Sequence, residues 1–152
     1  MARLITKGTT DVSDYIYIQD SADGSAETGI TVTGLDMQYV RDNTAPTAKV
    51  DATSGSLTAH SDNTIIEVDA TDQPGLYKVD WPDAAFATGV DHVVCTVSGT
   101  GFAPVHREFI LTSVDLFDAV RGGMTALPNA AADAAGGLPV SDAGGLDLDQ
   151  NP

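Results

Sequence analysis

Short runs of alternating apolar and polar residues recur through the first 112 residues of the chain. Alternation with a period of two is typical of a β-strand that buries one face and exposes the other. The runs that predict strands are 15–18, 35–39, 48–52, 65–69, 76–81, 92–97 and 105–111. No apolar pattern in this region fits a helix of more than three turns. Seven or eight short strands at such intervals predict an all-β sandwich rather than an α/β fold.

The fifth of these runs makes a sharp prediction about side-chain direction. Tyr77, Val79 and Trp81 fall on one side of the strand, and we expect them to face the core. Lys78 and Asp80 fall on the other side, and we expect them to face water.

Clusters of Asp, Asn, Gly and Pro separate the runs and predict turns at 20–24, 42–46, 73–75 and 98–101. The most specific is Asp72-Gln-Pro-Gly-Leu-Tyr77, which places proline before glycine as a type II turn requires. A Pro-Gly-x-Tyr sequence that leads into a strand is common in immunoglobulin-like and prealbumin-like sandwiches. There the tyrosine ring packs in the core and its hydroxyl satisfies a nearby backbone group.

The composition changes at Ser113, after which Ala, Gly, Asp, Leu and Pro dominate. Such a segment has too little apolar area to offset its own ordering entropy, so it should not fold alone. We therefore expect two parts, a sandwich over 1–112 and a C-terminal segment over 113–152. The segment is expected to begin with a short helix, capped by Ser113 or Asp115 and ended by Gly122-Gly123.

A short sequence that occurs twice in the C-terminal segment indicates a binding role. Asp133-Ala-Ala-Gly-Gly-Leu138 is followed by Asp142-Ala-Gly-Gly-Leu146. Gly and Ala let a backbone approach a neighbour closely, and periodic leucines can anchor in pockets. We expect the segment to be extended and to order only when laid across a neighbouring subunit. The predicted partner-binding anchors are Leu116, Phe117, Val120, Leu127, Leu138, Leu146 and Leu148.

Residues that carry chemistry are few. His60, His92 and His106 are too scattered to predict a metal cluster, and we expect each to be a surface or strand histidine. Cys95, the single cysteine, excludes an internal disulfide. It alternates with valines in its run and is expected to be a buried small hydrophobe rather than a catalytic thiol.

A calcium site is one interpretation of 19–27, where acidic residues flank Asp23-Gly24. The alternating acidic positions of a helix-loop-helix calcium site are missing, so a hairpin loop with a positive-φ glycine is favoured. No Gly-x-Ser-x-Gly motif, phosphate-binding loop or dinucleotide fingerprint occurs. We expect no catalytic residues, no cofactor and no metal.

The charge narrows the range of partners. The 22 acidic residues against 7 basic ones give a formal net charge of −15, which argues against nucleic acid and anionic membranes as partners. No run approaches the roughly 20 apolar residues of a membrane-spanning helix. The first residues contain no apolar stretch of a secretory signal, so we expect synthesis in the cytoplasm.

The stretch from Ile65 to Gly89, which contains Asp-Gln-Pro-Gly-Leu-Tyr-Lys-Val-Asp-Trp, resembles a module of tailed-bacteriophage virion proteins. The opening Leu4-Ile-Thr-Lys-Gly8 and the segment from Leu127 to Asp149 resemble it as well. The resemblance implies an immunoglobulin-like antiparallel β-sandwich, similar to the N-terminal domain of baseplate upper proteins. The functions of that family are not catalytic, so the resemblance implies no active-site residues.

The resemblance implies a non-enzymatic virion structural protein, made in the host bacterial cytoplasm and ending in the particle. The leading expectation is a tail or baseplate fibre-attachment component that binds other virion proteins, with homo-oligomers expected from the symmetry of such particles. A capsid decoration protein that clasps neighbouring capsid subunits is the first alternative. A carbohydrate-binding module, with Trp81 and the tyrosines as candidate sugar contacts, is an alternative of another class.

Overall fold

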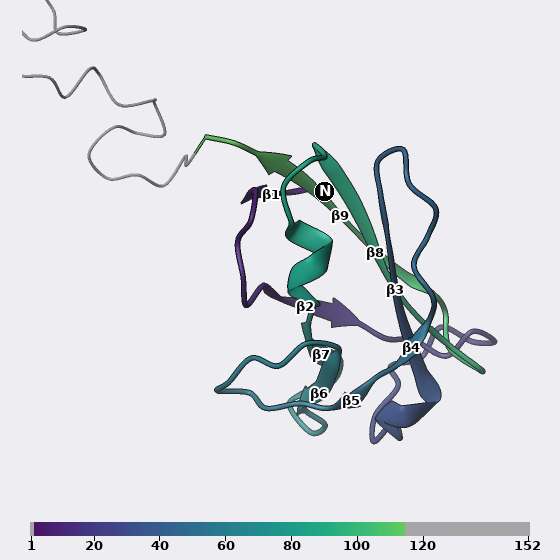
Figure 1. The fold of residues 1–152 in the computed structure, drawn as a ribbon. Coiled ribbons are helices and arrows are strands. Elements are labelled where there is room, and N and C mark those ends of the chain that lie inside the picture. Colours follow the sequence, from purple (N-terminus) through teal and green to yellow (C-terminus); the bar gives the residue numbers. More distant parts are fainter. Residues whose placement is uncertain (1, 115–152) are drawn as a thin grey trace, which may run out of the picture. The chain divides into compact units, whose positions relative to one another are not determined.

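Two β-sheets form the layers of residues 2–114, the part of the chain that the computed structural model describes (Figure 1). The five-stranded sheet has the order β1 (Arg3–Thr6), β9 (Val105–Thr112), β8 (His92–Gly99), β3 (Leu35–Arg41), β4 (Val50–Asp51). The four-stranded sheet has the order β2 (Ser13–Tyr17), β7 (Gln73–Asp80), β6 (Thr64–Asp69), β5 (Thr53–Ser54). The strands all belong to the unit Met1–Ser113, and a second unit of the chain begins at Val114.

Helical structure within residues 2–114 is confined to two short 3₁₀ turns, η1 (Val32–Gly34) and η2 (Asp83–Phe86). Across these residues, no helix has the length and apolar character needed to cross a bilayer. The all-β sandwich predicted from the alternating runs is therefore confirmed at the level of fold class. The short helix predicted after Ser113 falls almost wholly outside the described residues.

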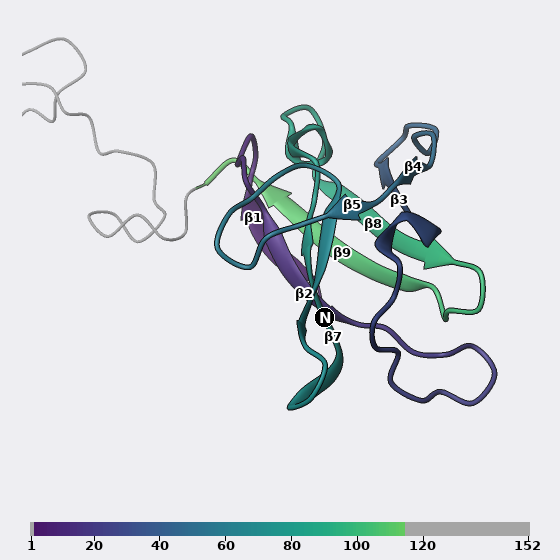
Figure 2. The ribbon, with the colours of Figure 1, turned by 90° about the horizontal axis from the view of Figure 1, so that it is seen from below.

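Each of the seven predicted runs overlaps a strand, although 48–52 does so only at Val50–Asp51. Two edge strands, β1 and β5, were not predicted, and both run parallel to their neighbours. Leu4 of β1 lies opposite Ile110 of β9, and Figure 2 shows these two strands side by side. Thr53 of β5 lies opposite Thr64 of β6. The prediction of a purely antiparallel sandwich is wrong at these edges.

The core lies between the sheets and is built from the inward positions of the alternating runs. Tyr77, Val79 and Trp81 are each at most 1% exposed, which confirms their predicted direction. The Trp81 and Phe86 rings both meet Phe109 edge to face, with centroid distances of 6.4 and 5.1 Å. Offset or edge-to-face pairs of this kind add about 0.5–1.5 kcal/mol beyond simple burial.

The prediction that Lys78 and Asp80 of β7 face water is wrong, because both side chains are buried. The loop between β5 and β6, residues 55–63, lies over this face of the sheet. Lys78 Nζ donates to the carbonyl oxygens of Ser56 and Ala59 at 2.9 and 2.7 Å. An alternating pattern indicates which residues share a face, but it does not show whether a loop covers that face.

Asp80 balances the Lys78 charge beneath the loop. Its Oδ1 lies 2.8 Å from Lys78 Nζ and accepts a 2.6 Å hydrogen bond from Ser13 Oγ. Its Oδ2 accepts from Thr64 Oγ1 at 3.0 Å. Burial acts to raise the pKa of Asp80, but the hydrogen bonds from Lys78, Ser13 and Thr64 outweigh it and lower the pKa.

The turn predicted at Pro74-Gly75 lies elsewhere. The chain reverses between β6 and β7 at 69–72, where Asp69 Oδ1 accepts from the amides of Thr71 and Asp72 at 2.8 and 2.9 Å. Pro74 and Gly75 are already part of β7. Gly75 does have the positive φ expected of this glycine, +80°, and its carbonyl accepts from Ile18 N–H at 2.9 Å.

Tyr77 behaves as its position after the Pro-Gly pair predicts. Its ring is buried, and its hydroxyl donates to the carbonyl of Glu27 at 3.1 Å and accepts from the amide of Ile30 at 3.5 Å. Burial raises the pKa of Tyr77 to about 12. The phenol therefore stays neutral and ties the loop before η1 to the core of the sandwich.

Candidate functional site

The predicted partner-binding anchors begin at Leu116 and so lie outside the described residues. They are Leu116, Phe117, Val120, Leu127, Leu138, Leu146 and Leu148. Candidate sites within residues 2–114 must therefore be found on the sandwich itself.

The free edge of β2 is protected by two arginines from the opposite sheet. Arg3 Nη1 donates to the Ser13 carbonyl at 2.7 Å, and Arg107 Nη2 donates to the Tyr15 carbonyl. Arg107 also pairs with Asp14 at 3.1 Å. Capping of edge carbonyls by charged side chains keeps an edge strand from pairing with another chain. This edge is therefore a poor template for adding a strand.

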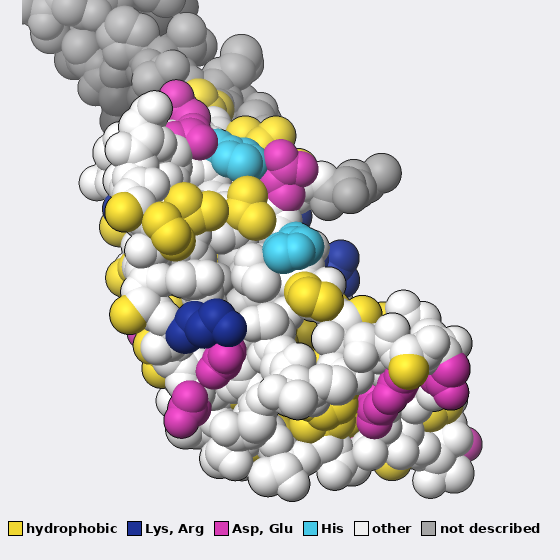
Figure 3. All heavy atoms as spheres, turned by 90° about the vertical axis from the view of Figure 1, so that its right-hand side faces the viewer, with side chains coloured by type: hydrophobic (Ala, Val, Ile, Leu, Met, Phe, Trp, Pro, Cys, Tyr) yellow, Lys and Arg dark blue, Asp and Glu magenta, His cyan; other side chains and the backbone are white. Residues whose placement is uncertain are grey.

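Exposed apolar side chains lie in pairs at two places on the sandwich. Tyr15 and Tyr17 share the outer face of β2 and are 51% and 46% exposed. Leu4 and Ile110 lie opposite each other on β1 and β9 and are 36% and 46% exposed. In the view of Figure 3, hydrophobic side chains lie in separate groups among acidic, basic and histidine side chains.

A mainly apolar hollow of about 320 Å³ opens beside β3 and β4. Met37, Tyr39, Val50 and Trp81 are among its lining residues. Trp81 is only 1% exposed, so its indole is not available for stacking against a sugar. Its Nε1 is buried and has no hydrogen-bond partner among the described residues.

Two of the three histidines lie where the sequence analysis expects. His92 lies in β8, between Asp42 at 3.3 Å from Nδ1 and Glu108 at 2.8 Å from Nε2. His106 lies exposed on β9, and its Nδ1 is 3.0 Å from Thr96 Oγ1. The two carboxylates at His92 contact opposite ring nitrogens and so do not share a common centre.

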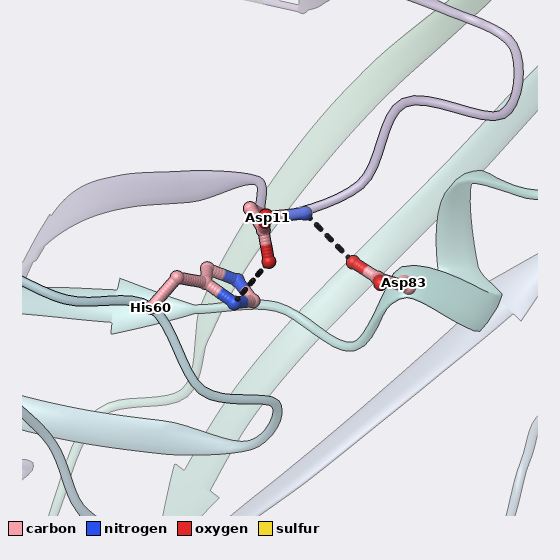
Figure 4. Close-up of side chains that lie close together, drawn as sticks. All are labelled: Asp11, His60 and Asp83. Atoms are coloured by element: carbon pink, nitrogen blue, oxygen red, sulfur yellow. Dashed lines mark hydrogen bonds and ion pairs between the residues drawn. The ribbon is translucent and has the colours of Figure 1, made fainter.

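The prediction that His60 is a surface histidine is wrong, because its side chain is only 11% exposed. Loop 55–63 carries the imidazole to the turn before β2, where Nδ1 lies 3.2 Å from Asp11 Oδ1. Asp83, the first residue of η2, completes a cluster in which one potential ligand atom from each residue lies within 4.8 Å of the others. Figure 4 shows these three side chains coming from three separate segments of the chain.

Asp83 is held in place by the backbone around it. Its Oδ1 accepts a 2.8 Å hydrogen bond from Asp11 N–H, and its own N–H donates to Asp62 Oδ1 at 3.3 Å. Asp11 adopts a positive φ of 57°, which is uncommon outside glycine but tolerated by Asp and Asn. No shared spacing links residues 11, 60 and 83, so only the fold reveals that they meet.

The acidic loop at 19–27 forms the hairpin-like turn that the sequence analysis favours. Asp20 Oδ1 accepts from the amides of Ala22 and Asp23 at 2.6 and 3.2 Å, and Asp23 Oδ1 accepts from Ser25 at 2.8 Å. Hydrogen bonds from Ser25 lower the pKa of Asp23. Gly24 supplies the expected positive φ of +75°. These carboxylates stabilise the turn backbone.

Cys95 is buried between the two valines of its run, as predicted. Burial, with the Asp14 charge as a smaller contribution, raises the pKa of the thiol to about 12. A thiol of that pKa stays protonated at neutral pH and is a poor nucleophile.

Comparisons with protein-family models, curated proteins and solved structures match nothing to this chain.

Proposed function

We propose that this chain is a non-enzymatic structural protein of a tailed-bacteriophage virion, built on an immunoglobulin-like sandwich. Its role is a tail or baseplate fibre-attachment component that binds other virion subunits. The observation that carries the proposal is the strand order. In an immunoglobulin domain, strands B, E and D are neighbours in one sheet, and strands C, F and G are neighbours in the other. Here β2-β7-β6 and β3-β8-β9 have those places in the two sheets.

The edges differ from that order, because β1 lies beside β9 rather than beside β2, and β5 adds a short strand next to β6. The first strand, β1, lies beside the last, β9, and completes the five-stranded sheet. The chain lacks the antibody hallmarks, since Trp81 follows β7 rather than lying on β3, and Cys95 is the single cysteine. Many cell-surface and adhesive domains share the sandwich without those hallmarks. This arrangement supports a binding scaffold rather than an antibody-type domain.

The surface of the sandwich supports assembly through side chains rather than through strand addition. The arginine-capped edge of β2 resists pairing with another strand, whereas Leu4 and Ile110 present an exposed aliphatic pair. The net charge of −15 favours virion partners with basic or polar patches. In this proposal the C-terminal segment, 113–152, supplies the anchoring contacts to neighbouring subunits, and the protein ends in the particle after synthesis in the host cytoplasm.

Deletion of residues 124–152 tests the proposal. The shortened chain is expected to fold, because the strands and the buried core all lie before Ser113 in the described part of the chain. It should be absent from purified particles, whereas the full chain is present, as measured by mass spectrometry of virions. A chain in which Leu138 and Leu146 become alanine gives a milder version of the same loss. Normal occupancy by the shortened chain would overturn the anchoring role.

A capsid decoration protein is the alternative within the same class. It uses the same sandwich and the same C-terminal segment but occupies the head lattice. The position of the chain in the particle separates the two roles.

A carbohydrate-binding module remains the alternative from another class, and one observation favours it. Tyr15 and Tyr17 lie on one face of β2 and are both about half exposed. Aromatic faces of this kind stack on sugars, whereas Trp81 is buried and does not contribute. Saturable glycan binding that is lost in Tyr15→Ala and Tyr17→Ala variants would favour this reading over the virion role.

A further inference from the structure

Three ligand-type side chains from distant parts of the chain converge beside η2 (Figure 4). Asp11 comes from the turn before β2, His60 from loop 55–63, and Asp83 from the first turn of η2. We propose that Asp11, His60 and Asp83 form a binding site for one divalent transition-metal ion of the zinc class. Such a site would add one shared link among three separate segments of the chain.

The separation of the donor atoms fits a shared ion. Zinc binds imidazole nitrogen at about 2.0–2.1 Å and carboxylate oxygen at about 2.0–2.2 Å, so two adjacent ligands lie about 3.0–3.5 Å apart. His60 Nδ1 and Asp11 Oδ1 are 3.2 Å apart. Asp83 brings a carboxylate oxygen within 4.8 Å of one potential ligand atom of each of the other two residues, a gap that a side-chain rotation can close.

The burial of His60 is the second and independent observation. Its side chain is 11% exposed, and Nε2 is buried without a hydrogen-bond partner among the described residues. If the ring proton lies on Nδ1 and faces Asp11, Nε2 is left as an unsatisfied acceptor. If the proton lies on Nε2, the Nδ1 lone pair faces a carboxylate. A cation bound at Nδ1 removes that repulsion.

A polar space also borders His60. His60, Ser56, Ser61 and Thr64 line a polar hollow of about 250 Å³, which is large enough for water. Once the metal holds Nδ1, the ring proton is on Nε2, and a small shift of the ring would let Nε2–H donate a hydrogen bond to a water in this hollow. Metal-ligating histidines almost always donate their other N–H to such a partner, which fixes the tautomer.

Asp83 is held at the site by a backbone hydrogen bond that occupies one of its two carboxylate oxygens. Its Oδ1 accepts from Asp11 N–H at 2.8 Å, which leaves Oδ2 as the free donor atom. Asp62 Oδ1 accepts from Asp83 N–H and adds a further negative charge nearby. Two carboxylates and a neutral imidazole carry a charge of −2, which matches a divalent cation.

The donor set selects among cations. Imidazole suits zinc, copper, iron and nickel, whereas calcium and magnesium prefer sites made of oxygen ligands. Three protein ligands leave one zinc position for water. We therefore expect zinc to bind and magnesium and calcium to bind poorly.

The test uses the full chain without an affinity tag, dialysed against EDTA and then titrated with Zn²⁺ by calorimetry. One ion per chain is expected, and saturation should raise the melting temperature by at least about 5 °C, because a ligand that binds only the folded state stabilises it. Equal concentrations of Mg²⁺ or Ca²⁺ should leave the melting temperature within about 1 °C of the metal-free value.

Variants separate this site from other acidic groups. His60→Gln and Asp83→Asn should each weaken zinc binding at least about tenfold. Asp83→Asn retains an Oδ1 that accepts the Asp11 N–H, so this variant is expected to fold even if His60→Gln does not. His92→Gln is the matched control, because its two carboxylates contact opposite ring nitrogens. That variant should bind zinc as the unmodified chain does.

Imidazole NMR of the unmodified chain gives a readout that needs no variant. At one equivalent of Zn²⁺ the His60 ring signals should shift, while those of His92 and His106 stay in place. Absence of saturable zinc binding would overturn the proposal. Unchanged affinity in Asp83→Asn, or a loss in His92→Gln equal to that in the site variants, would overturn it too.

Discussion

At the scale of single residues, the Lys78–Asp80 pair shows how a charged contact is accommodated under a loop. Both side chains are at least nine-tenths buried, and their charges lie 2.8 Å apart. Each also makes hydrogen bonds that replace those lost to water. Lys78 donates to two loop carbonyls, and Asp80 accepts from Ser13 and Thr64. Removal of one partner leaves a buried charge uncompensated, which is more costly than loss of a surface pair.

Asp80→Asn is therefore expected to lower the free energy of unfolding by about 3–5 kcal/mol at pH 7. Asp36→Asn is the matched control, because Asp36 pairs with Lys49 at 2.9 Å on an exposed surface. Its cost should be at most about 1 kcal/mol. Urea denaturation of the three proteins measures both effects, and equal costs would contradict the structural role given to the buried pair.

The same pair predicts a dependence on pH. The folded-state pKa of Asp80 is lowered, so its contribution is present above the unfolded value of about 4 and is lost as pH falls through the folded pKa. The stability difference between the unmodified chain and Asp80→Asn should therefore narrow below about pH 4. A difference that stays constant from pH 7 to pH 3 would contradict this assignment of the charge.

Tyr77 shows a different use of a buried polar atom. Its hydroxyl satisfies two backbone groups of the loop before η1, so it connects an irregular segment to the core. Its raised pKa means that this contribution is fully present below about pH 10 and is lost as pH rises through about 12.

At the scale of elements, β7 is the central strand that links its sheet to the core and to η2. It pairs with β2 and β6, carries Tyr77 and Val79 into the core, and leads through Trp81 to η2. Gly75 is needed where the end of β2 and the loop after it pack closely against this strand. A Cβ built there would lie 2.8 Å from Tyr17 Cε2 and 3.1 Å from both Ala26 Cβ and the Ile18 carbonyl oxygen.

Gly75→Ala should destabilise the fold by about 2–4 kcal/mol, because it adds a clash to the cost of a positive φ. Gly24→Ala is the matched control, with a similar φ of +75° and no atom within 4 Å of the built Cβ. That change should cost only the backbone strain, about 1–2 kcal/mol. Thermal or urea unfolding compares the two variants, and equal costs would contradict the close approach at Gly75.

The elements that the sequence could predict are those with a long alternating signal. Strand β8, with Val93, Cys95 and Val97 inward, is an example, since alternation and burial coincide. Strand β1 is four residues long and β5 only two, too short for a period to be read. Their parallel pairing depends on partners distant in sequence, which periodicity does not report.

At the scale of the whole molecule, the same limit applies to the candidate metal site. The histidine that matters is the one in a polar loop, which local pattern assigns to the surface. Only the folding of loop 55–63 over β7 brings His60 to Asp11 and Asp83. By contrast, the burial of Trp81 follows directly from its alternating position. The sequence alone therefore indicates that Trp81 is a poor candidate for stacking on a sugar.

At this scale we propose a sandwich that is placed in a particle by contacts with other subunits. The strand order supplies a rigid scaffold with one protected edge, and the C-terminal segment is assigned the role of attachment. In this proposal both parts serve to place the protein in the particle. The protein is therefore expected to occupy a defined position in the phage particle.

A cryo-electron-microscopy map of the intact phage particle tests that claim most directly. We expect density for the two-sheet sandwich at the neck, baseplate or fibre roots, repeated with the local symmetry and joined to a neighbouring subunit by the C-terminal segment. Density on the capsid lattice would favour the decoration role instead. Particles that contain no copy of the chain would contradict the virion proposal.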